Sequence, residues 1–363
     1  ERISQFDGKL YLELGGKLFD DHHASRVLPG FLPDSKLRMF QKLSDSIEII
    51  IVISATDIEK NKTRADLGIT YDEDVLRLRG EFQNRGFMVG SVVITHFNGQ
   101  PAACAFRQRL ERDGIKTYYH YLIEGYPHDV QRIASDEGFG KNDYVETSRP
   151  LVIVTAPGPG SGKMAVCLSQ LYNEHKRGVR AGYAKFETFP VWNLPLKHPV
   201  NVAYEAATAD LNDVNMIDPF HLEAYNKIAV NYNRDIEIFP VLNALFEGIY
   251  GSNPYKSPTD MGVNMVGFCI SDDGVCCEAS KNEIIRRYYD ATNKMARGAC
   301  NENEISKIRL LLSQSKINTD FRRTTVAAKQ SLKETGHTSS AIELEDGTII
   351  TAHSSELLGC SAA

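Results

Sequence analysis

The sequence predicts an α/β protein with a mostly parallel sheet, and two features of its first half support this. Apolar runs of strand length occur at residues 10–14, 47–54, 91–95, 116–119 and 151–155. Between them lie stretches of helical spacing, at residues 37–43, 71–85 and 101–112, and a further one follows at 163–176. The run at 47–54 is nearly continuous in Ile and Val, which is typical of a strand buried on both faces. Strands separated by helices predict a parallel sheet, because parallel neighbours need long crossover connections.

After Phe189 the pattern becomes mainly helical, with expected helices at residues 200–211, 235–249, 278–297 and 303–312. Two short apolar runs at 341–344 and 348–351 are joined by a turn containing Asp346-Gly347, which predicts a β-hairpin. A helical pattern at 354–363 follows it. We therefore expect an α/β domain over residues 1–198, a mainly helical region over 199–325, and the start of a small α/β domain over 326–363. Because the chain opens on Glu1 and its last pattern stops abruptly, we expect a longer natural polypeptide.

The composition is that of an ordinary globular protein and excludes several classes. The chain has 363 residues, of which 42% are hydrophobic and 24% charged, so a disordered or fibrous chain is excluded. Lys and Arg number 41 against 47 Asp and Glu, a balance that argues against a nucleic-acid partner. No apolar stretch reaches the roughly 20 residues of a membrane helix. The seven cysteines form no C-x-x-C pair, so we expect reduced thiols in a cytoplasmic protein.

The strongest functional pattern is a glycine-rich loop between a predicted strand and a predicted helix, at residues 150–172. Three glycines let successive backbone N–H groups turn toward one point, and the following helix directs its positive end there. The predicted phosphate-binding residues are Gly158, Gly160, Ser161, Gly162 and Lys163. This is the context that a P-loop requires. A purely structural tight turn at a buried strand end is the alternative.

The match to a P-loop is incomplete in a way that bears on metal binding. The first glycine of the pattern is replaced by Pro157, and the hydroxyl residue that ligates Mg²⁺ is replaced by Met164. A thioether does not bind a hard cation. The loop therefore resembles a phosphate site without its usual metal ligand.

A second candidate lies at the end of the first predicted strand. It combines a glycine pair and a lysine that could bind phosphate, two carboxylates that could bind Mg²⁺, and two imidazoles that could accept a proton. These residues are Gly15, Gly16, Lys17, Asp20, Asp21, His22 and His23. A solvated helix start with acidic residues at its positive end is the alternative.

An acidic loop before the P-loop strand carries Asp136 and Glu137. These carboxylates could hold Mg²⁺ from the far side of a phosphate and so compensate for Met164. An ordinary surface loop is the alternative.

Long segments of the chain closely resemble a bacterial family of uncharacterised proteins. They are GGKLFDDHHASRVLPGF, EIIIVISATDIEKNKTRADLGITYD, VTAPGPGSGKMAVCLSQLYNEHKRG, AGYAKFETFPVWNLPLKHPVNVAYEAATADLNDVNMIDPFHLEAYN and SPTDMGVNMVGF. The family is known only as a domain of unknown function and includes cytosolic proteins of Firmicutes and Actinobacteria. The resemblance covers nearly the whole chain and implies a multidomain α/β protein somewhat longer than it. It supplies no activity and no site residue.

Three functions fit these residues. The first is a nucleotide- or phosphate-dependent transferase or hydrolase, in which Lys163 offsets charge on a transferring phosphoryl group and His22 or His23 accepts a proton. In this hypothesis Mg²⁺ is held by Asp136 and Glu137, or by Asp20 and Asp21. The second is a non-catalytic protein that binds or senses a phosphorylated ligand, and Met164 favours it. The third is a scaffold with structural turns only. Apolar helix faces in the middle segment suggest a homo-oligomer.

Overall fold

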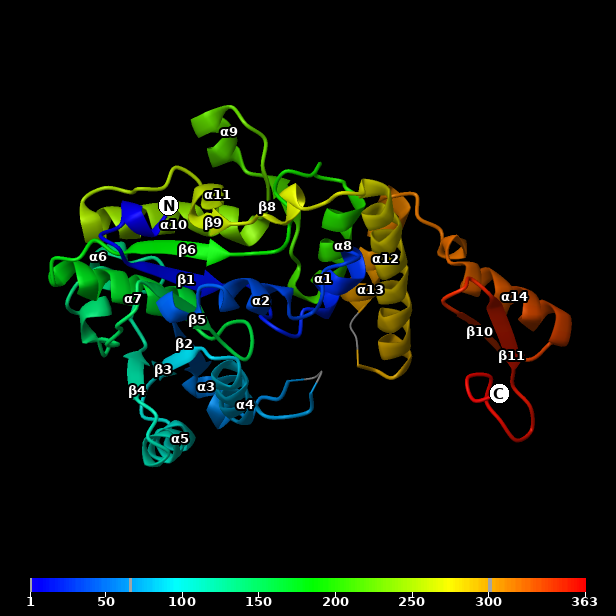
Figure 1. Ribbon diagram of the computed structural model, residues 1–363, viewed down its shortest axis with the longest axis horizontal. Helices are drawn as coiled ribbons and strands as arrows, with labels where there is room; N and C mark the ends of the chain where they lie inside the picture. The colour runs from blue at the N-terminus through cyan, green and yellow to red at the C-terminus, as the bar shows by residue number, and fades with distance from the viewer. Residues whose placement is uncertain (1, 65–66, 300–301) are drawn as a thin grey trace. The chain divides into compact units, whose positions relative to one another are not determined.

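The computed structural model describes residues 2–64, 67–299 and 302–363 (Figure 1). Its main sheet has seven strands in the order β4-β3-β2-β5-β1-β6-β9, and every neighbouring pair is parallel. The strands are β1 (Leu10–Leu14), β2 (Ile47–Ser54), β3 (Met88–Phe97), β4 (Thr117–Tyr121), β5 (Leu151–Thr155), β6 (Gly182–Phe186) and β9 (Gly262–Val263). The predicted α/β class and mostly parallel sheet are confirmed.

The central strands are buried along their whole length, as their apolar runs predicted. All eight residues of β2 and all five of β1 and of β5 are buried. Two carboxylates within these strands have partners. Glu48 accepts hydrogen bonds from the backbone N–H groups of Ser148 (2.7 Å) and Arg149 (3.3 Å), and Glu13 accepts one from the Tyr183 hydroxyl (2.7 Å). Each buried charge is therefore hydrogen-bonded, as a dry sheet interior requires.

The helices cover the sheet or form a second unit. They are α1 (His22–Val27), α2 (Ser35–Gln41), α3 (Ala55–Glu59), α4 (Tyr71–Asn84), α5 (Pro101–Arg112), α6 (Val130–Ile133), α7 (Lys163–Lys176), α8 (Pro199–Ala207), α9 (Pro219–Tyr225), α10 (Asn233–Tyr250), α11 (Pro258–Met261), α12 (Asp273–Ala296), α13 (Glu302–Gln314) and α14 (Arg323–Thr335). In α4 the buried residues include Tyr71, Val75, Leu78 and Phe82, which share one face at helical spacing. This face packs on β2 and β3.

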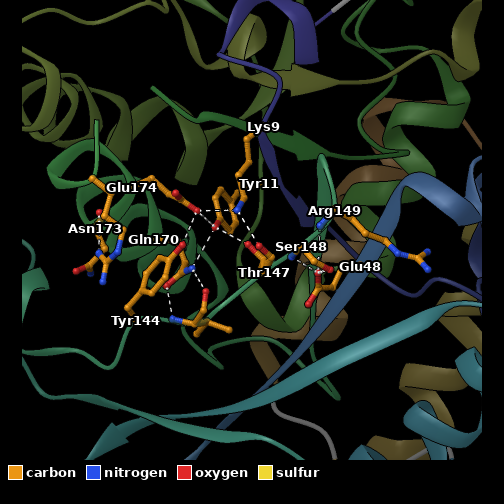
Figure 2. Close-up of polar contacts among 12 residues, drawn as sticks. Lys9, Tyr11, Glu48, Tyr144, Thr147, Ser148, Arg149, Gln170, Asn173 and Glu174 are labelled. Atoms are coloured by element: carbon orange, nitrogen blue, oxygen red, sulfur yellow. Dashed lines mark hydrogen bonds and ion pairs between the residues drawn. The ribbon is translucent and has the colours of Figure 1, made fainter. Parts of the chain in front are cut away.

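Helix α7 is fixed against β1 by a buried polar network (Figure 2). The Tyr11 hydroxyl donates to Glu174 (2.7 Å) and accepts from Gln170 Nε2 (3.1 Å). Lys9 pairs with Glu174 at 2.9 Å, and Tyr144 donates to the same carboxylate at 3.1 Å. Burial, together with the neighbouring Glu174, raises the pKa of Tyr11 well above its ordinary value, so the phenol stays protonated. The network holds the helix whose first residue is Lys163.

The chain forms two compact units that interleave along the sequence. The first contains residues 1–25, 30–194 and 215–269, and with them the main sheet. Residues 215–269 contribute a short antiparallel pair, β7 (Asn215–Ile217) with β8 (Val230–Tyr232), and the edge strand β9. These strands lie in the region that the sequence predicted to be mainly helical. The domain boundaries drawn from sequence at 198 and 325 remain predictions.

The second unit contains residues 26–29, 195–214 and 270–363. Helices α8, α12 and α13 pack together, and α14 packs on the antiparallel pair β10 (Ser339–Glu343) and β11 (Ile349–His353) (Figure 1). The predicted hairpin is confirmed, with Gly347 at φ +81° in its turn. The helix predicted at 354–363 is wrong, because these residues form irregular turns in which Leu357 is 93% exposed. A helix with no core to cover lacks the packing that stabilises it.

Candidate functional site

The order of the strands creates a topological switch point at the carboxyl ends of β2 and β5. These two strands are neighbours, but the next strand after β2 lies on one side of them and the next strand after β5 lies on the other. Right-handed crossovers then place the two following connections on opposite faces of the sheet. Open parallel sheets bind ligands at such a switch point. The glycine-rich loop follows β5 and therefore opens at this edge.

The shape of the loop depends on its glycines. Gly160 and Gly162 adopt positive φ angles of +73° and +86°, and Gly162 caps α7 in the left-handed conformation. A Cβ atom on Gly158 would lie 2.2 Å from the Tyr71 hydroxyl, so only glycine fits beside this residue. The Ser161 hydroxyl donates to the Gly158 carbonyl at 2.5 Å. Thr95, at the end of β3, donates to the Ser161 carbonyl at 2.6 Å and ties the loop to the sheet.

The backbone N–H groups of the loop have no hydrogen-bond acceptor within the described part of the protein. Among the described residues, no backbone N–H group from residue 158 to 165 donates a hydrogen bond to the rest of the protein. The first N–H groups of a helix need an external partner, and a phosphate is a common one. Carbonyl groups of the same loop are instead satisfied, by Thr95 and by Ser161.

Lys163 is half-buried and, within the described part of the chain, forms no ion pair. Burial lowers the pKa of its ammonium group below the ordinary 10.5, the nearby Glu13 opposes this shift, and the charge of Lys185 adds to it. A lysine in this state gains most from an anion, because the anion restores the stability of its charged form. The residue that the sequence proposed as the phosphate-binding cation therefore has the electrostatics for that role.

The loop offers no ligand for a protein-held Mg²⁺. Met164 takes the place of the usual hydroxyl, and the Ser161 hydroxyl is directed to the Gly158 carbonyl. Asp136 and Glu137 lie near the opposite end of α7. Asp136 accepts a hydrogen bond from Tyr172 (2.8 Å) and pairs with Lys176, and Glu137 pairs with Lys141 (2.6 Å). Tyr172 lies nine positions after Lys163 on α7, roughly 13 Å at the rise of an α-helix, so the structure does not bring these carboxylates to the loop.

A buried charged cluster lies beside the loop, at the carboxyl ends of β1 and β6. Lys185 forms ion pairs with Glu187 (2.7 Å) and Asp235 (2.6 Å). The two carboxylates, together with Met164 and Tyr183, are among the residues that line a small cavity. Burial raises the pKa of the Glu187 carboxyl group to about 7, and the charge of Lys185 opposes this shift.

Gly15 and Gly16, the glycine pair of the second candidate site, mainly stabilise the end of strand β1. The Gly15 N–H donates to the Phe186 carbonyl at 2.8 Å, and a Cβ atom there would lie 2.9 Å from the same oxygen. Gly16 has φ +71°, and Lys17 is exposed. Because the N–H of Gly15 is used within the protein, this turn is a weaker candidate for phosphate than the loop after β5.

The acidic and imidazole residues that follow are engaged in the fold. Asp20 lies 3.3 Å from Arg77 and 3.5 Å from Arg64. Asp21 pairs with the buried Lys36 (2.7 Å) and accepts the Ala24 N–H (3.0 Å). Carboxylates that already neutralise cations are poor ligands for Mg²⁺.

The two imidazoles differ in their surroundings. His22 is exposed at the start of α1, whereas the His23 ring packs edge-on against Phe189, with the ring centres 4.9 Å apart. The structure gives neither of them a contact with a loop glycine on which a proton-transfer role could be built.

Sequence reasoning missed the residues that come from the start of helix α4 and from strands β1 and β3. Tyr71, Thr95 and Glu13 border the loop or Lys163, and His96 adopts φ +52° at the end of β3 with its Nδ1 3.1 Å from the Ser54 hydroxyl. Burial lowers the pKa of His96. Their position at the ends of predicted strands could have revealed some of these residues, because polar residues that end parallel strands meet at one edge of the sheet.

Two further expectations concern the whole chain. No helix among the described residues is long and apolar enough to cross a membrane. Six cysteines are free thiols in the structure, at positions 104, 167, 269, 276, 277 and 360. Cys300 lies outside the described residues.

Comparison with known proteins places the chain in one bacterial family. Residues 1–316 match the family model described as domain of unknown function DUF1846, N-terminal, and residues 320–363 match its C-terminal counterpart. The chain is 58% identical to the UPF0371 protein of Streptococcus pyogenes serotype M5 and 59% identical to that of Streptococcus thermophilus strain LMD-9, over its full length and 74% of theirs. The chain therefore belongs to the DUF1846 family of uncharacterised bacterial proteins, as the resemblance of its motifs implied.

Proposed function

We propose that this protein binds the phosphate group of a small molecule, a nucleotide or a phosphorylated metabolite, at the loop between β5 and α7. The observation that carries the proposal is the set of N–H groups at residues 158 and 160–165 that have no acceptor in the described protein and that lie, with Lys163, after β5 at the switch point of the sheet. Backbone N–H groups hold the phosphate oxygens, and Lys163 neutralises their charge. Thr95 and Ser161 keep the loop carbonyls turned away from the anion.

The residues of the loop favour binding of a phosphorylated ligand without phosphoryl transfer. Met164 and the distant Asp136 and Glu137 leave the loop with no protein ligand for Mg²⁺ among these residues. Phosphoryl transfer from a nucleotide commonly relies on a metal ion that is anchored by the protein. The protein therefore fits a phospho-ligand sensor or carrier better than a kinase or nucleotide hydrolase.

The direct test is thermal unfolding of the full chain with ATP, GTP, inorganic phosphate and a panel of sugar phosphates. A ligand at 100 times its Kd stabilises the native state by about 2.7 kcal/mol, which raises the Tm by several degrees. We expect at least one phosphorylated compound to do so, and its unphosphorylated counterpart not to. Lys163→Met should abolish this shift, because it removes the charge and keeps an unbranched side chain that is one heavy atom shorter.

Lys176→Met is the matched control. Lys176 lies on the same helix, but in its last turn, where it pairs with the exposed Asp136. This variant should bind as the wild type does. Equal loss of binding in both variants, or no shift with any phosphorylated compound, contradicts the proposal. Mg²⁺-dependent release of phosphate from ATP that Lys163→Met abolishes would show an enzyme instead of a binding protein.

A further inference from the structure

Three side chains of the kinds that bind transition metals meet in the second unit. His198 precedes α8, and Asp273 and Cys277 lie in the first two turns of α12, four residues apart and therefore on one helix face. Helices α8 and α12 lie side by side (Figure 1). One ligand atom from each residue falls within 4.8 Å of the other two. The cluster belongs to a unit other than the one that holds the glycine-rich loop.

Two of the three separations between these residues match a tetrahedral zinc site. His198 Nε2 lies 2.9 Å from Asp273 Oδ1 and 3.4 Å from Cys277 Sγ, and Cys277 Sγ lies 3.6 Å from Asp273 Oδ2. Zinc bonds of about 2.0–2.3 Å at tetrahedral angles place ligand atoms about 3.4–3.6 Å apart. The two distances to sulfur already have this value, and the shorter imidazole–carboxylate distance is that of a hydrogen bond.

The fold holds the three residues in place, and of the three His198 is the one that also caps a helix. The buried His198 caps α8, its Nδ1 accepting the Val200 N–H at 3.2 Å, and Asp272 caps α12 by accepting the Val275 N–H at 3.1 Å. Asp273 is therefore not needed as a cap. Its carboxylate is exposed and Cys277 is half-buried, which leaves room for solvent beside the cluster.

We propose that His198, Asp273 and Cys277 bind a zinc-class divalent ion, with water as the fourth ligand. Thiolate, imidazole and carboxylate together suit zinc and similar ions, whereas Mg²⁺ and Ca²⁺ prefer oxygen ligands only. Three protein ligands with an open fourth position are typical of zinc sites that bind a further group.

Binding of the metal ion releases one proton and changes the tautomer of the imidazole. Cys277 binds as the thiolate and releases its thiol proton to solvent. In the free protein Nδ1 of His198 accepts a hydrogen bond, so the neutral ring carries its proton on Nε2. Coordination through Nε2 requires the other tautomer, and the proton then resides on Nδ1. The capping bond to Val200 is exchanged for the metal bond, a small loss beside the free energy of zinc binding.

The experiment uses the full chain, stripped of metal and titrated with Zn²⁺ and with Co²⁺. We expect one ion per chain and, with Co²⁺, the charge-transfer absorption of a cobalt–thiolate bond and the visible bands of a tetrahedral site. Cys277→Ser, Asp273→Asn and His198→Asn each remove one ligand. Asn at position 198 remains a good helix cap, so the fold of α8 is kept. Each variant should weaken Zn²⁺ binding by more than about 100-fold, the upper range seen for outer-shell partners.

Cys276→Ala is the matched control, since Cys276 precedes Cys277 on the same helix but is outside the cluster. This variant should keep the affinity and the cobalt–thiolate band. The proposal is overturned if the wild type binds neither ion. It is equally overturned if Cys277→Ser retains the thiolate band, or if Cys276→Ala loses it.

Discussion

Gly158 is the residue on which the shape of the loop depends most directly. A Cβ atom at this position would lie 2.2 Å from the Tyr71 hydroxyl and 2.7 Å from Cζ of the same ring. Tyr71 is buried at the start of α4, so the ring has little freedom to move away. Side-chain volume is therefore excluded here by a neighbouring helix rather than by the backbone angle.

Gly158→Ala should destabilise the protein by about 1–3 kcal/mol, because overpacking displaces Tyr71. Urea unfolding measures this loss. Tyr71→Leu removes the ring, so the double variant should lose less stability than the sum of the two single variants. Additive losses would show that the two residues do not conflict.

A buried histidine predicts how acid affects the fold. His120 is 3% exposed, its Nε2 lies 3.1 Å from the Asp143 carbonyl, and burial lowers its pKa from 6.5 to about 4. Below pH 6.5 the unfolded chain takes up a proton that the folded chain does not, so the free energy of unfolding falls as the pH drops toward 4. The loss from this residue should be on the order of 3 kcal/mol. In His120→Gln this part of the acid slope should be absent from urea-unfolding curves measured between pH 6.5 and 4, and equal slopes would contradict the assignment.

The residues of the candidate site could be predicted only in part. Gly158, Gly160, Gly162 and Lys163 lie within six consecutive residues, so a local sequence motif predicts them. Thr95 and His96 reach the same edge of the sheet through strand pairing, and no local pattern records that.

At the scale of elements, α7 connects the loop to the interior of the protein. Its first turn carries Lys163, and its last two turns carry the buried Gln170 and Glu174, which contact Tyr11 on β1 (Figure 2). The helix is thus anchored at the end remote from the loop. Its free N–H groups keep their direction because the other end of the helix is fixed.

Glu174→Ala should destabilise the protein by about 3–5 kcal/mol, since it leaves Lys9 as an unpaired charge in a largely buried place and removes the acceptor of Tyr11. Asp136→Ala removes an exposed ion pair with Lys176, at the end of the same helix, and should cost far less stability. Chemical denaturation of both variants gives the comparison. The assignment of α7 as anchored through Glu174 fails if the two losses are equal.

Periodicity predicted the long elements and missed the short ones. The apolar runs of β2 and β5 and the helical spacing of α4 and α7 correspond to the observed elements. The two-residue strand β9 has no period of its own and is set by pairing with β6. The pattern at residues 354–363 predicted a helix, but the side chains of Leu357 and Leu358 are exposed there and provide no packing to stabilise one.

At the scale of the whole molecule, the main sheet is complete before the second unit ends. Its last strand, β9, ends at Val263, and the C-terminal family match begins at residue 320. The helices α8, α12 and α13 of the second unit also lie before that point. The C-terminal segment therefore adds α14, β10 and β11 to a core that is built without them.

A chain that ends at residue 316 should fold, keep the circular-dichroism signature of an α/β protein and show the same ligand-induced rise in Tm as the full chain. Zn²⁺ binding should persist too, since Asp273 and Cys277 precede the cut. Sedimentation, circular dichroism and thermal unfolding provide the readouts. An aggregated or unfolded product would show that residues 317–363 are required by the core.

The strand order also dictates when the sheet can form during synthesis. Among the strands of the main sheet β1 leaves the ribosome first, but its two neighbours begin only at residues 151 and 182. Until β5 has been synthesised, β1 and one edge of the Ile-rich β2 lack the strand that pairs with both of them. Translation past β5 is the event that joins the two halves of the sheet, and we expect the growing chain to depend on chaperones until that strand has emerged.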